Sequence, residues 1–99
     1  MMQVRFSTVA EEELNDATAY YAESAPGLGL RFRAEVERSA KVLGRMPLLW
    51  PQVWPPVRRC LLRRFPYALI YAVEADYVFV IAVAHQHRKP DYWVYRSTK

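Results

Sequence analysis

The sequence predicts an α+β domain in which an N-terminal helical hairpin packs on a small, mostly antiparallel sheet, in the order β-α-α-β-β-β. Two observations predict this class. Residues 8–44 carry apolar side chains at helical spacing, whereas residues 59–84 contain apolar runs typical of strands. The chain has 99 residues, of which 53% are hydrophobic and 14% aromatic. That is enough for one core, and we expect a single domain over residues 1–99.

The first predicted element is a short strand, in which Val4 and Phe6 alternate with polar neighbours. A helix follows. Its predicted start is a capping box, in which the Thr8 hydroxyl accepts a hydrogen bond from the Glu11 amide. Pro26-Gly27 ends this helix. Acidic side chains crowd its first turns, where they suit the positive end of the helix dipole; they are Glu11, Glu12, Glu13 and Asp16.

A second helix is predicted from about Leu28 to Gly44, before Pro47. Apolar residues recur along it at steps of three and four, which indicates one buried face. The link to the first helix is short, so we expect the two to pack as an antiparallel hairpin. The other side of this helix is predicted to be exposed and holds Arg31, Arg33, Glu35, Glu37, Arg38 and Lys41.

Residues 46–57 are predicted to form a loop. Four prolines lie in this stretch, and they favour an extended path without regular structure. Trp50 and Trp54 lie between them. Both rings either form an exposed contact surface or pack over the edge of the core, and the pattern leaves both alternatives open.

Three further strands are predicted, at Arg59–Arg64, Tyr67–Val73 and Tyr77–Ala84. The last of these is apolar on both faces, which indicates a central strand that is covered on each side. Glu74–Asp76 is a tight connection and makes the last two strands an antiparallel hairpin. The stretch Pro90–Arg96 is aromatic and basic, and its pattern does not decide its conformation.

The net charge of +4 is distributed unevenly. Residues 1–57 hold six basic and seven acidic side chains, whereas residues 58–99 hold eight basic and three acidic ones. A local positive field of this kind favours nucleic acid or an acidic protein as a partner, although it also suits an ordinary solvated surface.

The cysteine content and the lengths of the apolar runs indicate in which cellular compartment the protein is expected. The lone Cys60 has no intramolecular disulfide partner, which points to a reducing environment. Met1–Phe6 lacks the apolar run of a signal peptide, and the stretch Tyr77–Ala84 is too short to span a bilayer. We therefore expect a cytoplasmic protein with no membrane partner.

Several kinds of catalytic site are disfavoured. Only three glycines exist, and none forms a phosphate-binding loop. Cys60 lies in an apolar strand, where a buried hydrophobic role is more typical than a nucleophile paired with His85 or His87. The two histidines face the same side of a strand, but a metal site would need a third ligand, for which only Asp76 and Asp91 are near. We interpret the histidines as polar groups at a strand end, and we expect no metal and no cofactor.

The strongest candidate site is a group of cations with interleaved aromatic rings in the second half of the chain. Guanidinium groups bind phosphate and rings stack on bases, so the group suits RNA. It equally suits an acidic helix of a protein partner, or a solvated edge. The group consists of Arg58, Arg59, Arg63, Arg64, Arg88, Lys89 and Arg96, together with Tyr92, Trp93 and Tyr95.

Phe65–Tyr71, the apolar strand after it and the stretch from His85 to Arg96 closely resemble the RelE/ParE toxin superfamily. These are the toxins of bacterial type II toxin–antitoxin modules, often labelled plasmid stabilisation proteins. The similarity also includes residues 19–21, residues 28–32 and Arg59. It covers nearly the whole chain, with the same order of elements.

The ParE-like branch is the more similar one, through the two long helices, the Phe-Pro-Tyr strand start and the His-x-x-Arg-x-Pro-x-Tyr-Trp ending. The resemblance implies a toxin that inhibits growth by binding DNA gyrase and stalling it, without chemistry of its own. It also implies a cognate antitoxin that wraps the toxin in a hetero-oligomer. The partner-binding residues that it implies are Arg63, Arg64, His85, His87, Arg88, Tyr92, Trp93 and Arg96.

Two alternatives remain. A RelE-like toxin would be a metal-independent mRNA endoribonuclease acting on the ribosome, with Arg59, Arg88 and Tyr92 or Tyr95 as catalytic residues. However, Leu61 and Ala68 occupy positions where that branch usually carries basic side chains, so the catalytic set is partial. The third alternative is a module that still binds its antitoxin but has lost toxicity.

Overall fold

The computed structural model describes residues 1–96. Its elements are β1 (Gln3–Phe6), α1 (Thr8–Ser24), α2 (Leu28–Arg45), β2 (Gln52–Trp54), β3 (Val57–Leu61), β4 (Tyr67–Val73), β5 (Tyr77–His85) and the short 3-10 helix η1 (Val94–Arg96).

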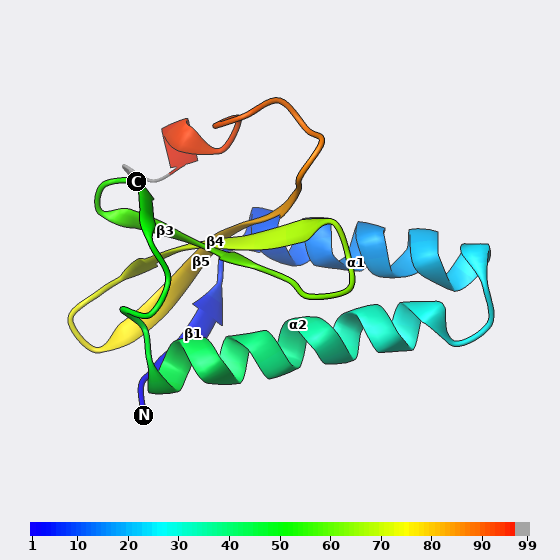
Figure 1. Cartoon of the computed structure of the whole chain (residues 1–99), viewed down its shortest axis with the longest axis horizontal. Helices are drawn as coiled ribbons and strands as arrows, with labels where there is room; N and C mark the ends of the chain where they lie inside the picture. The colour runs from blue at the N-terminus through cyan, green and yellow to red at the C-terminus, as the bar shows by residue number, and fades with distance from the viewer. Residues whose placement is uncertain (97–99) are drawn as a thin grey trace.

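The five strands form one mixed sheet in the order β1-β5-β4-β3-β2. β1 pairs with β5 in parallel, and the other three pairs are antiparallel. The helical hairpin lies on one side of the sheet, and the chain after β5 crosses the other side (Figure 1). The predicted α+β class and the order of its elements are confirmed, with one short strand added.

Apolar side chains pack on both faces of the sheet. One cluster joins the helices to the sheet and includes Phe32, Val36 and Tyr71. A second cluster lies on the opposite face, where Trp93 packs against side chains such as Ile70. β5 lies between β1 and β4 and is covered on both faces, as its apolar pattern predicts.

Two predictions for residues 46–64 were wrong. Gln52–Trp54 forms the edge strand β2 in spite of the flanking prolines, since an edge strand needs backbone partners on one side only. β3 runs over Val57–Leu61 and not over Arg59–Arg64. Residues 62–66, which carry two arginines, instead connect β3 to β4.

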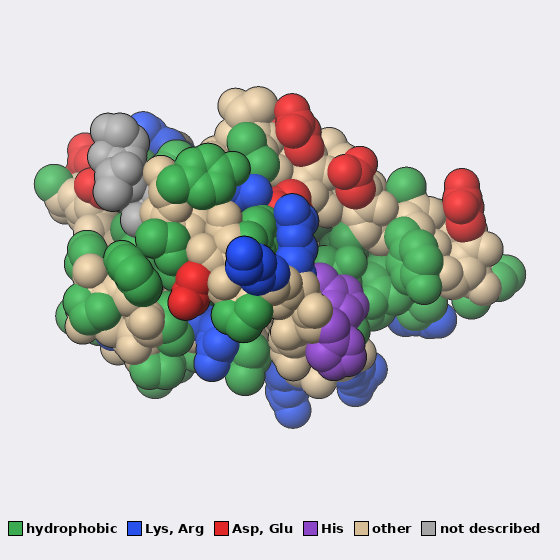
Figure 2. Space-filling model, turned by 90° about the horizontal axis from the view of Figure 1, so that it is seen from above, with side chains coloured by type: hydrophobic (Ala, Val, Ile, Leu, Met, Phe, Trp, Pro, Cys, Tyr) green, Lys and Arg blue, Asp and Glu red, His purple; other side chains and the backbone are tan. Residues whose placement is uncertain are grey.

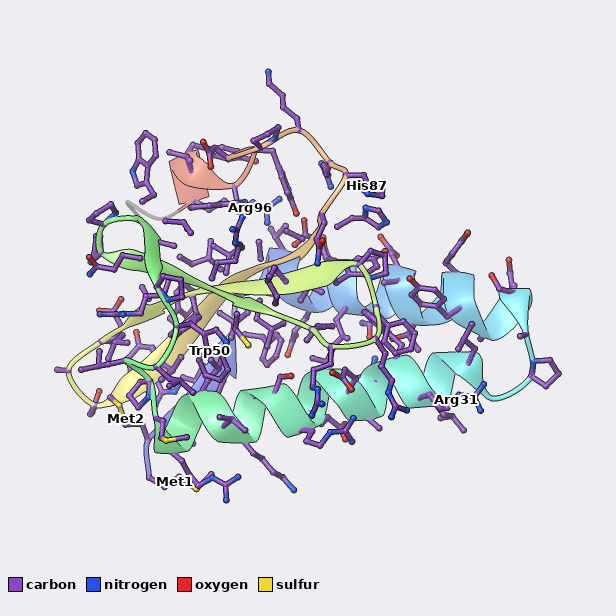
Figure 3. The ribbon with its side chains drawn as sticks, viewed as in Figure 1. Met1, Met2, Arg31, Trp50, His87 and Arg96 are labelled. Carbon is purple, nitrogen blue, oxygen red and sulfur yellow. The ribbon has the colours of Figure 1, made fainter. Side chains whose placement is uncertain are left out.

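The loop before β2 is held by two polar contacts. The Tyr71 hydroxyl donates to the carbonyl oxygen of Pro47 at 2.6 Å, and the Arg58 guanidinium donates to that of Trp50 at 2.7 Å. Trp50 lies between the sheet and α2 and packs against the core (Figure 3). Trp54 is 47% exposed. Trp50 therefore packs over the edge of the core, whereas Trp54 is exposed.

The first helix is capped by Ser7 and not by Thr8. The Ser7 hydroxyl accepts from the Ala10 amide at 3.0 Å and donates to the carbonyl oxygen of Ile81 at 3.2 Å. The Glu11 amide bonds to the Ser7 carbonyl, so the predicted capping box does not form. Ser7 thereby joins the start of α1 to β5.

Glu35 is buried, although it was predicted to lie on the exposed side of its helix. It lies three residues after the buried Phe32, so the same helical face contains both. One carboxylate oxygen accepts from the backbone amide of Arg63 at 2.9 Å, and the other pairs with Arg38. The carboxylate thereby fixes the β3–β4 connection against α2.

Cys60 is buried within the core cluster, as expected for a small hydrophobic side chain. Burial, with a smaller effect from the nearby Glu35 carboxylate, raises the pKa of its thiol to about 11. The thiol therefore stays protonated at neutral pH. Within residues 1–96, no helix is long and apolar enough to cross a membrane.

The helical hairpin depends on a close approach at Gly29. A methyl group at this position would lie 2.7 Å from the backbone oxygen of Thr18 and 3.0 Å from the β-carbon of Ala22. Backbone atoms cannot move aside without separating the helices, so this position requires glycine.

We expect Gly29→Ala to lower the free energy of unfolding by about 1–3 kcal/mol, because the forced separation of the helices outweighs the better helix propensity of alanine. Leu30→Ala is the matched control: its side chain is 76% exposed, and its melting temperature should stay close to that of the parent. An unchanged or higher melting temperature for Gly29→Ala would refute the close-packing argument.

A second prediction concerns Glu35 and pH. Burial alone would raise the pKa of this carboxyl, but the hydrogen bond from the Arg63 amide and the pairing with Arg38 together lower it below the ordinary value of 4.5. Its contribution to stability is therefore complete above that value and is lost as the pH falls through the lower folded-state pKa. Glu35→Gln should cost about 1–3 kcal/mol at neutral pH.

The difference between Glu35→Gln and the parent should shrink in denaturant titrations as the pH falls below the ordinary glutamate value of 4.5. Glu37→Gln, at an exposed position of the same helix, controls for the loss of a surface charge. A difference that stays constant with pH would contradict the assignment.

Candidate partner-binding site

The candidate site begins at an edge of β5 that has no strand beside it. β1 pairs with β5 only as far as Phe6, opposite Val80, whereas β5 continues to His85. Backbone groups on this edge therefore need other partners, because an unsatisfied buried amide or carbonyl is costly. Ser7 supplies the first, through its backbone amide to the Val80 oxygen and its hydroxyl to the Ile81 oxygen.

Glu13 of α1 supplies the next partner. One oxygen of its carboxylate accepts from the Val83 backbone amide at 3.0 Å. The other accepts from the Tyr92 hydroxyl at 2.7 Å. The Arg96 guanidinium donates to both oxygens at 3.2 Å. One side chain thus joins α1, the open edge of β5 and the chain that follows β5.

This following chain, residues 86–96, is here named the C-terminal segment. Its Trp93 is 4% exposed and packs on the sheet face opposite the helices. Its Arg96 is only 13% exposed at the side chain and lies between the segment and the sheet (Figure 3), with a further bond to the Ile81 oxygen. Trp93 and Arg96, which the resemblance assigns to partner binding, are therefore both largely buried.

The polar contacts change the protonation properties of the segment. Burial, followed by the hydrogen bond to Glu13, raises the pKa of Tyr92 above its ordinary value. Burial alone would lower the pKa of Arg96, but the hydrogen bonds that its guanidinium donates to Glu13 outweigh this effect and raise that pKa. Both groups therefore remain protonated at physiological pH, Tyr92 neutral and Arg96 charged.

Arg88 lies at the edge of this network and remains 55% exposed at its side chain. Its guanidinium stacks on the Tyr92 ring at 3.8 Å and lies 3.8 Å from a Glu13 oxygen. The stacking restricts where the charge can lie, while about half of the side chain remains accessible to solvent. Arg88 is thus a partly preorganised surface cation.

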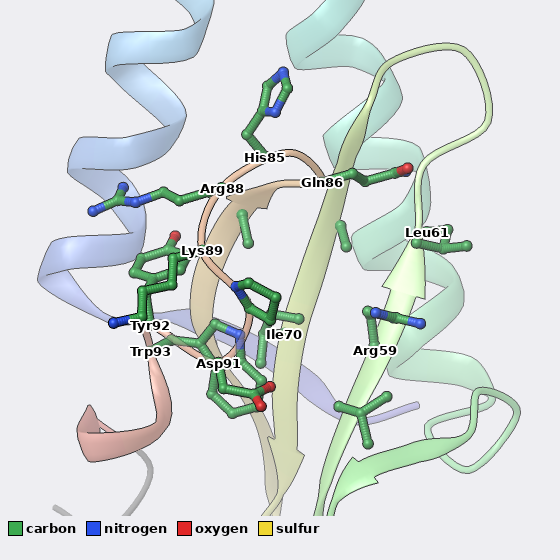
Figure 4. Close-up of a pocket in the computed structure, with 14 residues that line it drawn as sticks. Arg59, Leu61, Ile70, His85, Gln86, Arg88, Lys89, Asp91, Tyr92 and Trp93 are labelled. Atoms are coloured by element: carbon green, nitrogen blue, oxygen red, sulfur yellow. The ribbon is translucent and has the colours of Figure 1, made fainter.

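A pocket of about 280 Å³ opens between the C-terminal segment and the sheet, and is here named the C-terminal pocket. Arg59 and Leu61 of β3 line one side, and the C-terminal segment lines the other (Figure 4). Seen from this face, cationic and histidine side chains gather in the middle, with acidic side chains along the edge where α1 runs (Figure 2). The lining has a cationic part, formed by Arg59, Arg88 and Lys89, and an apolar part, formed by Val53, Leu61, Ala68, Ile70, Ala84 and Trp93.

The two histidines behave as groups at a strand end. The His87 backbone amide donates to Nδ1 of His85 at 3.0 Å, and the two rings lie 5.1 Å apart. The His85 ring also packs edge-on against Tyr67. Among residues 1–96, no three His, Cys, Asp or Glu side chains lie close enough together to hold a metal ion.

The predicted site residues do not all lie together in the structure. Arg59, His85, Arg88, Tyr92 and Trp93 all line the C-terminal pocket. Other predicted residues do not line it: Arg63 and Arg64 lie on the β3–β4 connection, His87 and Tyr95 are exposed elsewhere on the C-terminal segment, and Arg96 is paired with Glu13.

Sequence reasoning missed the role of Glu13, which it grouped with the other acids of the first helical turns. The spacing held a usable signal. Glu13 follows Ala10 by three residues and precedes Ala17 by four, and both alanines are buried. Helical periodicity therefore places Glu13 toward the core, whereas Glu12 is exposed.

The fold is that of a solved toxin–antitoxin protein. The chain matches a structure described as the chromosomal ParDE TA system from P. aeruginosa with a TM-score of 0.76, at 19% sequence identity, over 86% of this chain and 96% of that chain. At this identity the match shows the shared fold and does not by itself transfer a function.

The family follows from the sequence. The family model described as the ParE toxin of the type II toxin–antitoxin system, parDE, matches residues 4–90. Since this is most of the chain, the protein belongs to the ParE toxin family, and the resemblance to the ParE-like branch is confirmed. No curated protein matches the sequence.

We expect Glu13→Gln to lower the free energy of unfolding by about 2–4 kcal/mol, because it removes the charge that pairs with a largely buried Arg96 and one acceptor of the network. Hydrogen exchange in the C-terminal segment should rise with it. Glu12→Gln removes the same charge from the adjacent exposed position and should change stability by less than about 0.5 kcal/mol. Equal melting of the two variants would show that Glu13 does not hold the segment.

Proposed function

We propose that this ParE-family chain is an active toxin that binds DNA gyrase and stalls it, and that a cognate antitoxin neutralises it by binding. Family membership supports the toxin, and the resemblance of the sequence to gyrase-directed toxins supports the target. The observation that carries the proposal is the composition of the C-terminal pocket.

The C-terminal pocket suits a protein contact. Arg59, Arg88 and Lys89 are exposed at a hollow whose lining is otherwise largely apolar. Interfaces draw most of their affinity from a few anchors of this kind, in which an arginine pairs with a partner group beside an apolar surface that excludes water. The positive charge also favours encounter with an acidic surface of the partner. The Glu13 network attaches the segment to α1 and β5 before any partner binds, which reduces the ordering needed on binding.

The ribonuclease alternative has one observation in its favour, since Arg59, Arg88 and Tyr92 line the same pocket. The remaining lining does not fit that chemistry. Leu61 and Ala68 present apolar side chains, which cannot stabilise the charge that develops at a scissile phosphate. The Tyr92 hydroxyl already donates to Glu13, and its raised pKa keeps it protonated, so it is not available as a general base. The lining therefore favours binding over catalysis.

In a supercoiling assay with purified gyrase, the parent protein should inhibit the enzyme. Arg59→Ala and Arg88→Ala should each weaken inhibition by about tenfold or more, since loss of an interface arginine commonly costs about 2 kcal/mol. Arg45→Ala, an exposed position at the end of α2, should inhibit like the parent. Thermal melts of all variants show whether the fold is intact.

Two results would reverse the proposal. Cleavage of ribosome-bound mRNA by the parent, abolished in Arg59→Ala, would establish the ribonuclease. Normal bacterial growth during confirmed expression of the parent, with no effect on gyrase, would instead leave a module that has lost toxicity.

A further inference from the structure

A second basic surface lies on the helical side of the molecule. It is a groove of about 360 Å³ between α2 and the β3–β4 connection, here named the arginine groove. Its lining combines three arginines with a short apolar floor and one buried acid, and consists of Leu28, Arg31, Ala34, Glu35, Arg38, Arg64 and Phe65.

The helical period explains why the charges meet here. Arg31 and Arg38 are seven residues apart, which is two helical turns, so both lie on one stripe of α2. Arg31 lies near the start of α2, on the outer side of the helix (Figure 3). Arg64 comes from the β3–β4 connection on the other wall.

The buried Glu35 does not neutralise this surface. Its carboxylate is only 5% exposed and is occupied by the Arg63 backbone amide and the Arg38 guanidinium. Within the described part of the chain, the Arg31 and Arg64 side chains have no carboxylate partner. Two exposed cations are therefore left at the groove. The hydrogen bond that the Arg63 backbone amide donates to Glu35 keeps Arg64 beside α2.

We propose that the arginine groove is a docking site for an acidic segment of a protein partner, and that this partner is the antitoxin. The identity of the partner rests on the function proposed above. Carboxylates of the segment pair with Arg31 and Arg64, for which arginine is the better geometric match than lysine. An apolar side chain of the same segment fills the hollow over Leu28, Ala34 and Phe65.

The floor of the groove argues for a peptide and against a single-stranded nucleic acid. Single-stranded nucleic acids are bound by cations together with aromatic faces on which bases stack. Phe65 is the aromatic residue of the lining, and its ring already makes edge-on contacts with Tyr21 and Phe32, at centroid distances of 5.0 and 5.1 Å. It therefore forms the end of the core and not a stacking platform.

The position of the groove has a functional consequence. The arginine groove is built from α2 and the β3–β4 connection, whereas the C-terminal pocket lies on the sheet face opposite the helices. No residue lines both. Neutralisation and toxicity should therefore be separable by mutation.

The test uses the full chain and the protein encoded by the adjoining gene, purified separately. Arg31→Glu and the double variant Arg31→Glu/Arg64→Glu should bind that protein progressively more weakly, the double variant by at least about tenfold. The dependence of affinity on salt should be smaller in the double variant, because charged pairs are lost. Arg45→Glu, the same reversal at the far end of α2, should bind like the parent.

In cells, the double variant should still stop growth, but expression of the adjoining gene at a level that rescues the parent should no longer restore it. Thermal melts and the gyrase assay on the double variant show that its fold and its target surface are intact.

The outcomes separate the two proposals. If the parent is bound and rescued and the double variant is bound and rescued equally well, the docking proposal fails and the proposed function stands. If the parent neither stops growth nor binds the adjoining protein, both fail. If the double variant loses affinity for a short DNA duplex while its affinity for the adjoining protein is unchanged, the groove is a nucleic-acid site and the proposal is overturned.

Discussion

The Glu13 carboxylate is the interaction on which the arrangement of the candidate site depends. β1 has four residues and β5 has nine, so the parallel pair covers only part of the length of β5. The uncovered backbone has to be satisfied from outside the sheet, and Glu13 does so at the Val83 amide. The same carboxylate then accepts from Tyr92 and Arg96, so the satisfied edge becomes the anchor of the C-terminal segment.

Anchoring the segment has consequences on both sides of it. On the inner side, Trp93 closes the sheet face that the helices leave uncovered. On the outer side, Arg88 stacks on a Tyr92 ring whose hydroxyl is fixed by Glu13. A surface that would otherwise be a loose basic tail is thereby held over a defined pocket. Preorganisation of this kind is what a protein that acts by binding alone requires, because ordering a flexible segment on contact would reduce its affinity.

The elements with strong periodicity could be predicted from the sequence. Both helices and the central strand β5 agree with their apolar patterns, because burial of a continuous face depends on spacing alone. The boundaries of the strands near the prolines were harder to predict from the sequence. β2 and the shifted β3 depend on backbone pairing between segments, which residue propensity does not report.

The candidate site was predictable only in part. Its residue types and their location after β5 could be predicted, and Arg59, Arg88 and Tyr92 do meet at one pocket. Composition could not show which of the cations are already paired with a carboxylate of the same chain. Arg96 is paired with Glu13, which lies 83 positions earlier in the sequence, and no local sequence pattern indicates such a pair. The roles of Glu13 and Glu35 were not predicted, because a charged residue is ordinarily expected to face solvent. Each of them nevertheless follows a buried residue of its helix by three positions.

The account is tested most directly by hydrogen exchange at a single amide, that of Val83. This group faces the edge of β5 beyond β1, and its acceptor is the Glu13 carboxylate. We expect the Val83 amide in the parent to be protected to a degree similar to the strand-paired amides of β5, and to lose most of that protection in Glu13→Ala while amides paired with β4 keep theirs. Rapid exchange of Val83 in the parent, or protection that survives the substitution, would show that Glu13 does not complete the sheet and that the C-terminal segment is held by something else.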